Sequence, residues 1–168
     1  SEKVVRMPNS FINSIKYEYS NSKKVEQISS LPNKSVVLAA FHKTSKLSEE
    51  VVNAWANILI KSENTYLWFK KPVESAKRNL LSFLASRKID KERILFAGHV
   101  SSYEEHVSRY CLADIFLDTF NYNGHSTLVE CIWSELPFVT LLGKSFSSRV
   151  GGSILHSLNL DELICNSI

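Results

Sequence analysis

The sequence predicts an α/β protein whose core is a doubly wound parallel sheet, that is, a sheet covered by helices on both faces. Short apolar runs and longer segments with one apolar face alternate five times along the chain. The first short run, SVVLAAF, is a continuous apolar run with β-branched residues, which is typical of a strand buried on both faces. The longer segments have the period of amphipathic helices. This alternation favours parallel strands joined by helical crossovers.

The expected strands are apolar runs bounded by polar or turn residues. In chain order they are SVVLAAF (35–41), TYLWFK (65–70), RILFAG (93–98), DIFLDT (114–119) and PFVTLL (137–142). Pro137 fits this assignment because proline is tolerated at the first position of a strand. Residues 1–34, by contrast, have little periodicity and end in the turn-forming cluster SSLPNKS.

Each expected strand is followed by an expected helix. The first covers residues 48–61, with Ser48 as its N-cap, and the third opens with Ser102 and Glu105 in a Ser-x-x-Glu capping box. The last long helix extends from about 147 to 158, and a short acidic-started one begins at Asp161. The apolar faces are predicted to consist of Val51, Val52, Trp55, Ile58 and Leu59; of Ala76, Leu80, Leu81 and Leu84; and of Leu128, Val129, Ile132, Trp133 and Leu136.

Length and composition indicate one globular domain without a membrane span. A chain of 168 residues can bury one sizeable core but not two. No apolar run approaches the roughly 20 residues that a spanning helix needs, and the first residues lack the apolar stretch of a signal peptide. The three cysteines have no paired spacing, and two of them lie in apolar helical patterns. We therefore expect buried, reduced thiols and a cytoplasmic protein.

The net charge of +3 is unevenly distributed. Residues 1–46 hold eight Lys or Arg and three Asp or Glu, a local charge of +5, which leaves −2 for the rest. The basic residues are scattered among Ser and Asn, so a solvated segment is favoured over a nucleic-acid surface. No nucleic-acid partner is expected.

Polar residues gather after the ends of the expected strands. The segment HKTSK follows the first strand, HVSSYEEH the third, NYNGHST the fourth and GKSFSSR the fifth. Because ligands of open parallel sheets bind at the carboxyl ends of the strands, these segments indicate one shared site. The clustering is stronger evidence than any single residue in it.

The segment NYNGHSTLVECIW (121–133) predicts an anion site at the start of a helix. Gly124 permits a tight backbone approach, and Ser126 and Thr127 lie where a helix exposes unpaired N–H groups. Such a helix start binds phosphate, although Ser or Thr at this place also serves as an ordinary N-cap, and both roles stay open. The motif is neither GxGxxG nor GxxxxGK[ST], so it predicts neither a nicotinamide cofactor nor a P-loop nucleotide.

Single residues near this site also have two readings. Lys46 lies at the foot of the first helix, where a cation opposes the helix dipole and is therefore of functional interest; Lys43 and His106 are equally well explained as surface residues. Glu130 either accepts from sugar hydroxyls or suits the dipole. The five histidines lack metal-ligand spacing, and no serine lies in a GxSxG elbow, so neither a metal site nor a catalytic triad is expected.

The same segments carry a family resemblance along nearly the whole chain. SEKVVRMPNSF, VVLAAFHKTSKLSEEVVNAWANIL, EEHVSRYCLADIFLDTFNYNGHSTLVECIW and SSRVGGSIL occur in that order. They resemble the C-terminal catalytic lobe of O-linked N-acetylglucosamine transferases, a group that includes the plant SPINDLY-type proteins. The NGHST block, the EEHVxR block and the Trp-Ala-Asn-Ile-Leu helix make the resemblance specific.

The resemblance implies a GT-B glycosyltransferase, in which a sugar nucleotide lies between two Rossmann-like lobes. Residues 1–34 would be the inter-lobe linker segment and residues 35–168 the UDP-sugar-binding Rossmann-like lobe. Members of the family transfer a sugar from UDP to Ser or Thr of an acceptor protein, usually guided by tetratricopeptide (TPR) repeats. The other lobe and these repeats are expected outside this chain, so that the chain alone is not expected to turn over.

The resemblance also implies roles for residues of this chain. Lys46 matches the lysine that neutralises the UDP phosphates as the leaving group departs. The helix start that holds the diphosphate corresponds to His125, Ser126 and Thr127, and Glu130 matches an acidic residue, Asp in the animal enzymes, that binds the ribose. The uracil side corresponds to Val100 and Ser101, with His106 and Arg109 nearby.

Two residues depart from the animal enzymes. Lys43 stands in place of a glutamine near the diphosphate, and Tyr103 stands in place of a lysine beside uracil. Lys43 would strengthen diphosphate binding, and Tyr103 would stack on the base. Both departures also fit a different donor, such as UDP-glucose, or a non-catalytic module that binds a nucleotide or a partner protein.

The expected donor is UDP-N-acetylglucosamine, and no cofactor is expected. Glycosyl transfer from UDP requires that the developing diphosphate charge be stabilised, and a lysine together with helix N–H groups can do this without a metal ion. We see no DxD-like carboxylate pair near the expected site. The sequence thus predicts metal-independent binding.

Overall fold

The computed structural model of the protein describes residues 3, 5, 7, 10–12, 28 and 30–168. Within this part of the chain, a six-stranded parallel sheet has the order β3-β2-β1-β4-β5-β6. The strands are β1 (Val36–Ala40), β2 (Thr65–Lys70), β3 (Ile94–Ala97), β4 (Ile115–Leu117), β5 (Phe138–Leu141) and β6 (Ile164–Cys165). The predicted α/β class with a parallel sheet is confirmed.

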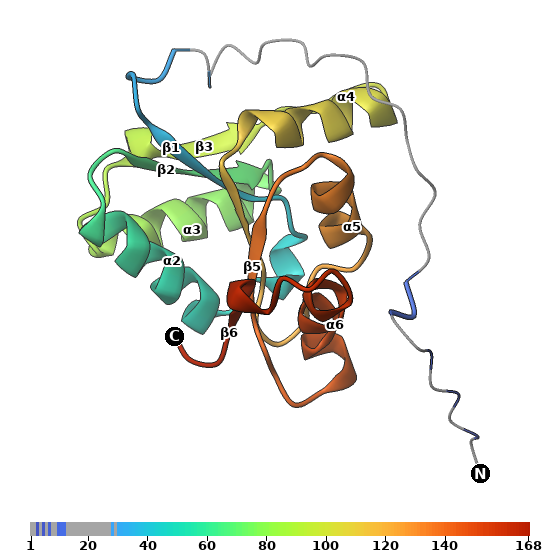
Figure 1. Cartoon of the computed structure of the whole chain (residues 1–168). Coiled ribbons are helices and arrows are strands. Elements are labelled where there is room, and N and C mark those ends of the chain that lie inside the picture. The colour runs from blue at the N-terminus through green and yellow to red at the C-terminus, as the bar shows by residue number, and fades with distance from the viewer. Residues whose placement is uncertain (1–2, 4, 6, 8–9, 13–27, 29) are drawn as a thin grey trace.

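Helices cover both faces of the sheet, which confirms the predicted doubly wound arrangement. The α-helices are α2 (Glu49–Lys61), α3 (Glu74–Ser86), α4 (Tyr103–Ser108), α5 (Ser126–Trp133) and α6 (Val150–Ser157). The 3-10 turns are η1 (Thr44–Lys46), η2 (Lys91–Arg93), η3 (Arg109–Leu112), η4 (Phe146–Ser148) and η5 (Asp161–Leu163). α2 and α3 lie on one side of the sheet, whereas α4, α5 and α6 lie on the other (Figure 1).

The two faces of the sheet build two hydrophobic cores. Val37 and Ala39 of β1 belong to the core under α4, α5 and α6, while Leu38 and Ala40 belong to the core under α2 and α3. This division follows from the two-residue period of a strand, which directs successive side chains to opposite faces. Since both faces are covered, β1 is apolar throughout, as the sequence pattern indicated.

Two predicted helix caps are present. The Ser48 hydroxyl accepts from the Val51 N–H at 3.3 Å, and the Ser102 hydroxyl accepts from the Glu105 N–H at 3.1 Å. The Glu105 carboxylate, however, accepts from the Ser101 N–H at 3.3 Å, one residue before the N–H that a capping box would use. Both caps fix the point at which the chain leaves the sheet edge and enters a helix.

Several details of the sequence prediction were wrong. The sixth strand was missed because its two residues, Ile164–Cys165, are too few to form a period. The helix expected over 147–158 is divided into η4 and α6, since the Ser145 and Ser148 side chains cap each other's backbone and close a separate turn. The short helix expected at Asp161 is the 3-10 turn η5.

The predicted burial was also wrong for Ile58 and for two of the three cysteines. Ile58 is 38% exposed because the buried side of α2 runs through Ala56 instead, while the neighbouring Leu59 is fully buried. All three cysteines are free, but only Cys131 is buried; Cys111 and Cys165 are exposed. Cys111 lies in the turn η3, whose apolar side is formed by other residues.

The predicted boundary between a linker segment (1–34) and a lobe (35–168) stays a prediction, because most of residues 1–34 lie outside the described residues. Of those described, Ile12, Ile28 and Leu31 pack against the core beneath α4, α5 and α6. Among the described residues, no helix is long and apolar enough to cross a membrane.

Adjacent residues of α2 provide a test of this core. Leu59→Ala should lower the free energy of unfolding by about 2–5 kcal/mol, since it removes a fully buried side chain and leaves a cavity. Ile58→Ala, on the exposed side of the same turn, should lower it by less than about 1 kcal/mol. Urea unfolding measures both changes, and equal losses would contradict the placement of α2.

Candidate functional site

The candidate site lies where the order of the sheet reverses. β1 and β4 are neighbours, but the chain leaves β1 toward β2 and leaves β4 toward β5. In an open α/β sheet, such a switch point opens a crevice at the carboxyl ends of the two strands. The turn η1, which contains Lys46, follows β1, and the loop of residues 118–125 follows β4. The two segments that the sequence analysis favoured therefore meet.

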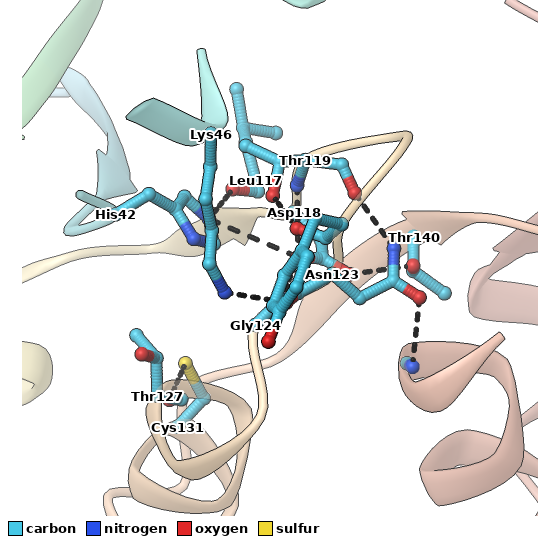
Figure 2. Close-up of polar contacts among 12 residues, drawn as sticks. His42, Lys46, Leu117, Asp118, Thr119, Asn123, Gly124, Thr127, Cys131 and Thr140 are labelled. Atoms are coloured by element: carbon cyan, nitrogen blue, oxygen red, sulfur yellow. Dashed lines mark hydrogen bonds and ion pairs between the residues drawn. The ribbon is translucent and has the colours of Figure 1, made fainter. Parts of the chain in front are cut away.

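A buried carboxylate organises the loop after β4. Asp118 is 2% exposed, and its Oδ1 accepts from the Thr119 N–H at 2.8 Å and the Gly124 N–H at 2.6 Å. Its Oδ2 accepts from the Thr140 hydroxyl at 2.7 Å (Figure 2). These bonds hold both ends of the 119–124 segment and tie it to β5. The loop is consequently a fixed structure and a suitable base for a binding site.

Asn123 extends this network to the next helix. Its side chain is fully buried; Nδ2 donates to the Thr119 carbonyl at 2.7 Å, and Oδ1 accepts from the Gly151 N–H at 3.1 Å. A side chain at Gly151 would be impossible without movement, because its Cβ would lie 2.5 Å from Thr140 Oγ1 and 2.8 Å from Asp118 Oδ2. The start of α6 is thus packed directly against the loop after β4.

His42, two residues after the end of β1, is buried and neutral. Its Nε2 lies 2.9 Å from the Leu117 carbonyl, which can only accept, so Nε2 carries the hydrogen. The same Nε2 is 3.9 Å from Asp118 Oδ1. Burial lowers the pKa of His42 to about 4, although the bond to Leu117 opposes this. His42 supports β4 rather than carrying a charge at neutral pH.

Lys46 is held at the mouth of this crevice. Its Nζ donates to the Asn123 carbonyl at 2.7 Å and lies 4.1 Å from the centroid of the Tyr122 ring. Figure 2 shows the lysine side chain extending from η1 toward the loop at Asn123 and Gly124. Burial lowers the pKa of Lys46, and Lys43 adds to this, whereas the charge of Asp118 opposes it. A partly desolvated ammonium therefore lies beside the loop that leads into α5.

The start of α5 supplies unpaired backbone donors. Leu128 N and Val129 N both donate to the His125 carbonyl, so that the N–H groups of Ser126 and Thr127 belong to the first turn, which has no intrahelical acceptor. The His125 ring stacks on Tyr122 with centroids 5.1 Å apart. Its pKa is lowered by burial and by the charge of Lys46. This combination of lysine and helix start favours an anion.

A second group of side chains surrounds Glu130, further along α5. Its carboxylate accepts from the Tyr110 hydroxyl at 2.7 Å and the Tyr103 hydroxyl at 3.0 Å, and the Nε2 of His106 lies 3.6 Å away. Burial alone would raise the pKa of Glu130, but the contacts with His106, Tyr110 and Tyr103 lower it below its usual value. Glu130 is therefore a carboxylate held in place between α4, η3 and α5.

The residues predicted to lie on the uracil side share one pocket. They line it together with residues 70–73 and 97–99, and they are Val100, Ser101, Tyr103, His106 and Arg109. Arg109 is only 5% exposed and donates to the Gly98 carbonyl at 3.3 Å. Burial lowers its pKa. Arg109 thus supports the loop after β3 and offers little of its surface to a ligand.

Sequence reasoning missed four residues of the site. His42, Asp118 and Asn123 form the buried framework, and Tyr122 contacts Lys46 and His125. Asp118 had a recognisable signal, since it is an acidic residue that follows the apolar run of β4 directly. Of the predicted residues, Lys43 is exposed and contributes its charge near Lys46.

Comparison with known proteins identifies the family. The family model described as glycosyl transferase family 41 matches residues 19–168. The chain belongs to glycosyl transferase family 41. Curated relatives include a protein of Arabidopsis thaliana described as a probable UDP-N-acetylglucosamine--peptide N-acetylglucosaminyltransferase, SEC, which is 31% identical over 100% of this chain and 18% of its own length. A protein of rice (Oryza sativa subsp. japonica), described as a probable UDP-N-acetylglucosamine--peptide N-acetylglucosaminyltransferase, SPINDLY, is 31% identical over 99% of this chain and 18% of its own length.

Other matches agree with this assignment. The UDP-N-acetylglucosamine--peptide N-acetylglucosaminyltransferase of Caenorhabditis elegans is 32% identical over 82% of this chain and 12% of its own length. A solved structure of a mutant O-GlcNAc transferase from Thermobaculum terrenum has the same fold, with a TM-score of 0.80 and 22% identity over 99% of this chain and 31% of that one. This family 41 chain thus spans less than a fifth of the length of these curated relatives. The Rossmann-like lobe expected of a GT-B glycosyltransferase is confirmed.

The buried pair of His42 and Asp118 gives a prediction about pH. The lowered pKa of His42 means that stability rises with pH between about 4 and 6.5, because the unfolded chain binds the proton more readily. The pKa of Asp118 is raised by burial to about 7, against its bonds from Gly124, Thr140 and Thr119, so it makes stability fall with rising pH over nearly the same range. The two effects should largely offset each other in the wild type.

Asp118→Asn keeps the hydrogen-bonding shape and removes one of these effects. Its free energy of unfolding should then rise with pH between 4 and 6.5, by up to about 1.4 kcal/mol per pH unit. Urea unfolding at several pH values measures this slope, with the wild type as the control. A variant whose stability is flat over this range would contradict the neutral state of His42.

Proposed function

We propose that this family 41 chain is the donor-binding lobe of a protein O-glycosyltransferase. The donor is UDP-N-acetylglucosamine, and the acceptor is a Ser or Thr hydroxyl of another protein. One observation carries the proposal: the Lys46 ammonium and the first N–H groups of α5 lie together at the switch point of the sheet. The peptide N-acetylglucosaminyltransferases among the relatives supply the substrate class.

The reaction needs a site that stabilises a leaving diphosphate. In the transfer, the acceptor hydroxyl oxygen forms a bond to the anomeric carbon and loses its proton, while the bond from that carbon to a diphosphate oxygen breaks. The electron pair of the broken bond leaves with UDP, on which negative charge develops. Lys46 supplies a positive charge, and the N–H groups of Ser126 and Thr127 supply donors that are already oriented. Such preorganised groups contribute most where charge develops in the transition state. His125 lies at the same helix start and would contact the same diphosphate.

The nucleoside would extend from this point along α5 and α4. Glu130 lies one turn after Thr127, so a nucleotide whose diphosphate lies at the helix start can direct its ribose toward this carboxylate. The oxygens of Glu130 keep acceptor capacity beyond the bonds from Tyr103 and Tyr110. The pocket lined by Val100, Ser101 and Tyr103 would take the uracil.

The proposal also covers the metal requirement, the other parts of the full protein and its location. Donor binding would be independent of a divalent metal, because Lys46 and α5 take the role of neutralising the diphosphate. The second lobe, the acceptor protein and TPR repeats would complete the activity. The three free thiols support a cytoplasmic location.

Lys46→Ala should weaken UDP binding about tenfold or more, since a charged hydrogen bond contributes roughly 1.5–3 kcal/mol. Calorimetric titration with UDP in EDTA measures this, with GDP and ADP as competitors for the base pocket and UDP-glucose compared with UDP-N-acetylglucosamine for the sugar. Lys91→Ala is the matched control, because Lys91 lies in η2 at the amino end of β3, whereas the site lies at the carboxyl ends of the strands. Equal affinities of the two variants would contradict the site, and a strict need for Mg²⁺ or Mn²⁺ would contradict metal independence.

Tyr103→Phe should weaken UDP binding about two- to fivefold, because it removes one of the two hydroxyl donors that hold the Glu130 carboxylate. The loss is modest since Tyr110 still donates to the same carboxylate. The same titration separates this role from base stacking. If the ring alone mattered, Tyr103→Phe would bind as the wild type does and only Tyr103→Ala would lose affinity.

A further inference from the structure

We propose that Tyr122 is a positioning residue for Lys46, whose ammonium it holds beside the start of α5. Lysine and helix would then act on the same anion without prior rearrangement. Neither the sequence motif nor the family resemblance singled out this tyrosine. The proposal rests on the proposed donor site, but its first test needs no donor.

Two contacts fix the end of the Lys46 side chain. Nζ lies 4.1 Å from the centroid of the Tyr122 ring, well within the roughly 6 Å over which a cation and an aromatic face attract each other. The same atom donates to the Asn123 carbonyl at 2.7 Å. The ring and the carbonyl belong to adjacent residues. The ammonium is therefore held by one short segment of the loop.

That segment is itself rigid. The Tyr122 carbonyl accepts from the Thr119 hydroxyl at 2.6 Å, and the next residue, Asn123, is fully buried and bonded at both ends of its amide. The Tyr122 ring also stacks on His125, with an interplanar angle of 19°. One ring consequently contacts both the lysine and the histidine that are proposed to hold the diphosphate.

The expected benefit is preorganisation. A free lysine side chain has several rotatable bonds, and ordering it when a ligand binds opposes binding. A lysine that the ring already holds loses less freedom at that moment. The ring is not needed for the core, since Tyr122 is 47% exposed. Its replacement should leave the fold intact and affect the lysine.

The first test measures the contact itself. An aromatic ring 4.1 Å from Nζ should shift the NMR signal of the Lys46 ε-methylene protons upfield. The shift should persist in Tyr122→Phe, which keeps the ring, and disappear in Tyr122→Leu. Phe146→Leu, which removes another exposed aromatic ring, is the matched control and should leave the shift unchanged. An unshifted Lys46 signal in the wild type would overturn the inference, whatever UDP does.

The second test measures the consequence for binding. Tyr122→Leu should weaken UDP binding about tenfold in calorimetric titration, whereas Tyr122→Phe should stay within about twofold of the wild type. Equal losses in both variants would assign the effect to the hydroxyl and overturn the positioning role. Unchanged affinity in Tyr122→Leu, with the ring-current shift lost, would overturn it as well. Failure of the wild type to bind UDP, with the shift present, would instead refute the proposed function and leave the Lys46–Tyr122 contact established.

Discussion

The interaction on which the rest of the site depends is the buried carboxylate of Asp118 with its three donors. Thr119 N–H, Gly124 N–H and the Thr140 hydroxyl all converge on it, so one side chain closes the loop after β4 and joins that loop to β5. A buried carboxyl group is tolerated only when its oxygens are hydrogen-bonded, and here these bonds shape the chain. The loop in turn carries Tyr122 and Asn123 to Lys46, and it sets where α5 begins. Asp118, which is not proposed to contact the ligand, thus positions the residues that are.

Sequence reasoning succeeded where a local pattern determines the structure. Strands buried on both faces are apolar throughout, and for this reason the long strands β1 and β2 were found with nearly correct bounds. Amphipathic α2 and its Ser48 cap were found for a similar reason. β6 was missed because two residues, Ile164–Cys165, hold no period, and its strand pairing with β5 depends on contacts far along the chain. The exposure of Ile58 likewise depends on what α2 packs against, which its own sequence does not contain.

The site was predictable in its location and less so in its bonding. The carboxyl ends of parallel strands lie at the same edge of the sheet, so the segments that contain Lys46, Tyr103 and His125 were expected to meet there. In the structure these segments follow the carboxyl ends of β1, β3 and β4. The sequence did not reveal that Glu130 is already bonded to two tyrosine hydroxyls, because Tyr110 lies in a different segment and no sequence pattern connects it with Glu130. The framework of His42 and Asn123 escaped notice for the same reason. Buried polar residues acquire their meaning only from partners that are distant in the sequence.

The packing of Gly151 has a consequence for how this sequence can change over generations. A methyl group at that position would overlap the Thr140 hydroxyl and the Asp118 carboxylate together, so the three positions cannot drift independently. A side chain at residue 151 requires that the Thr140 and Asp118 side chains move. A residue 140 that lacks a hydroxyl would leave Asp118 Oδ2 without its donor. Substitutions at Gly151, at the start of α6, are therefore limited by the hydrogen bond between Thr140 and Asp118. A change at any one of these three positions therefore requires the other two to adjust.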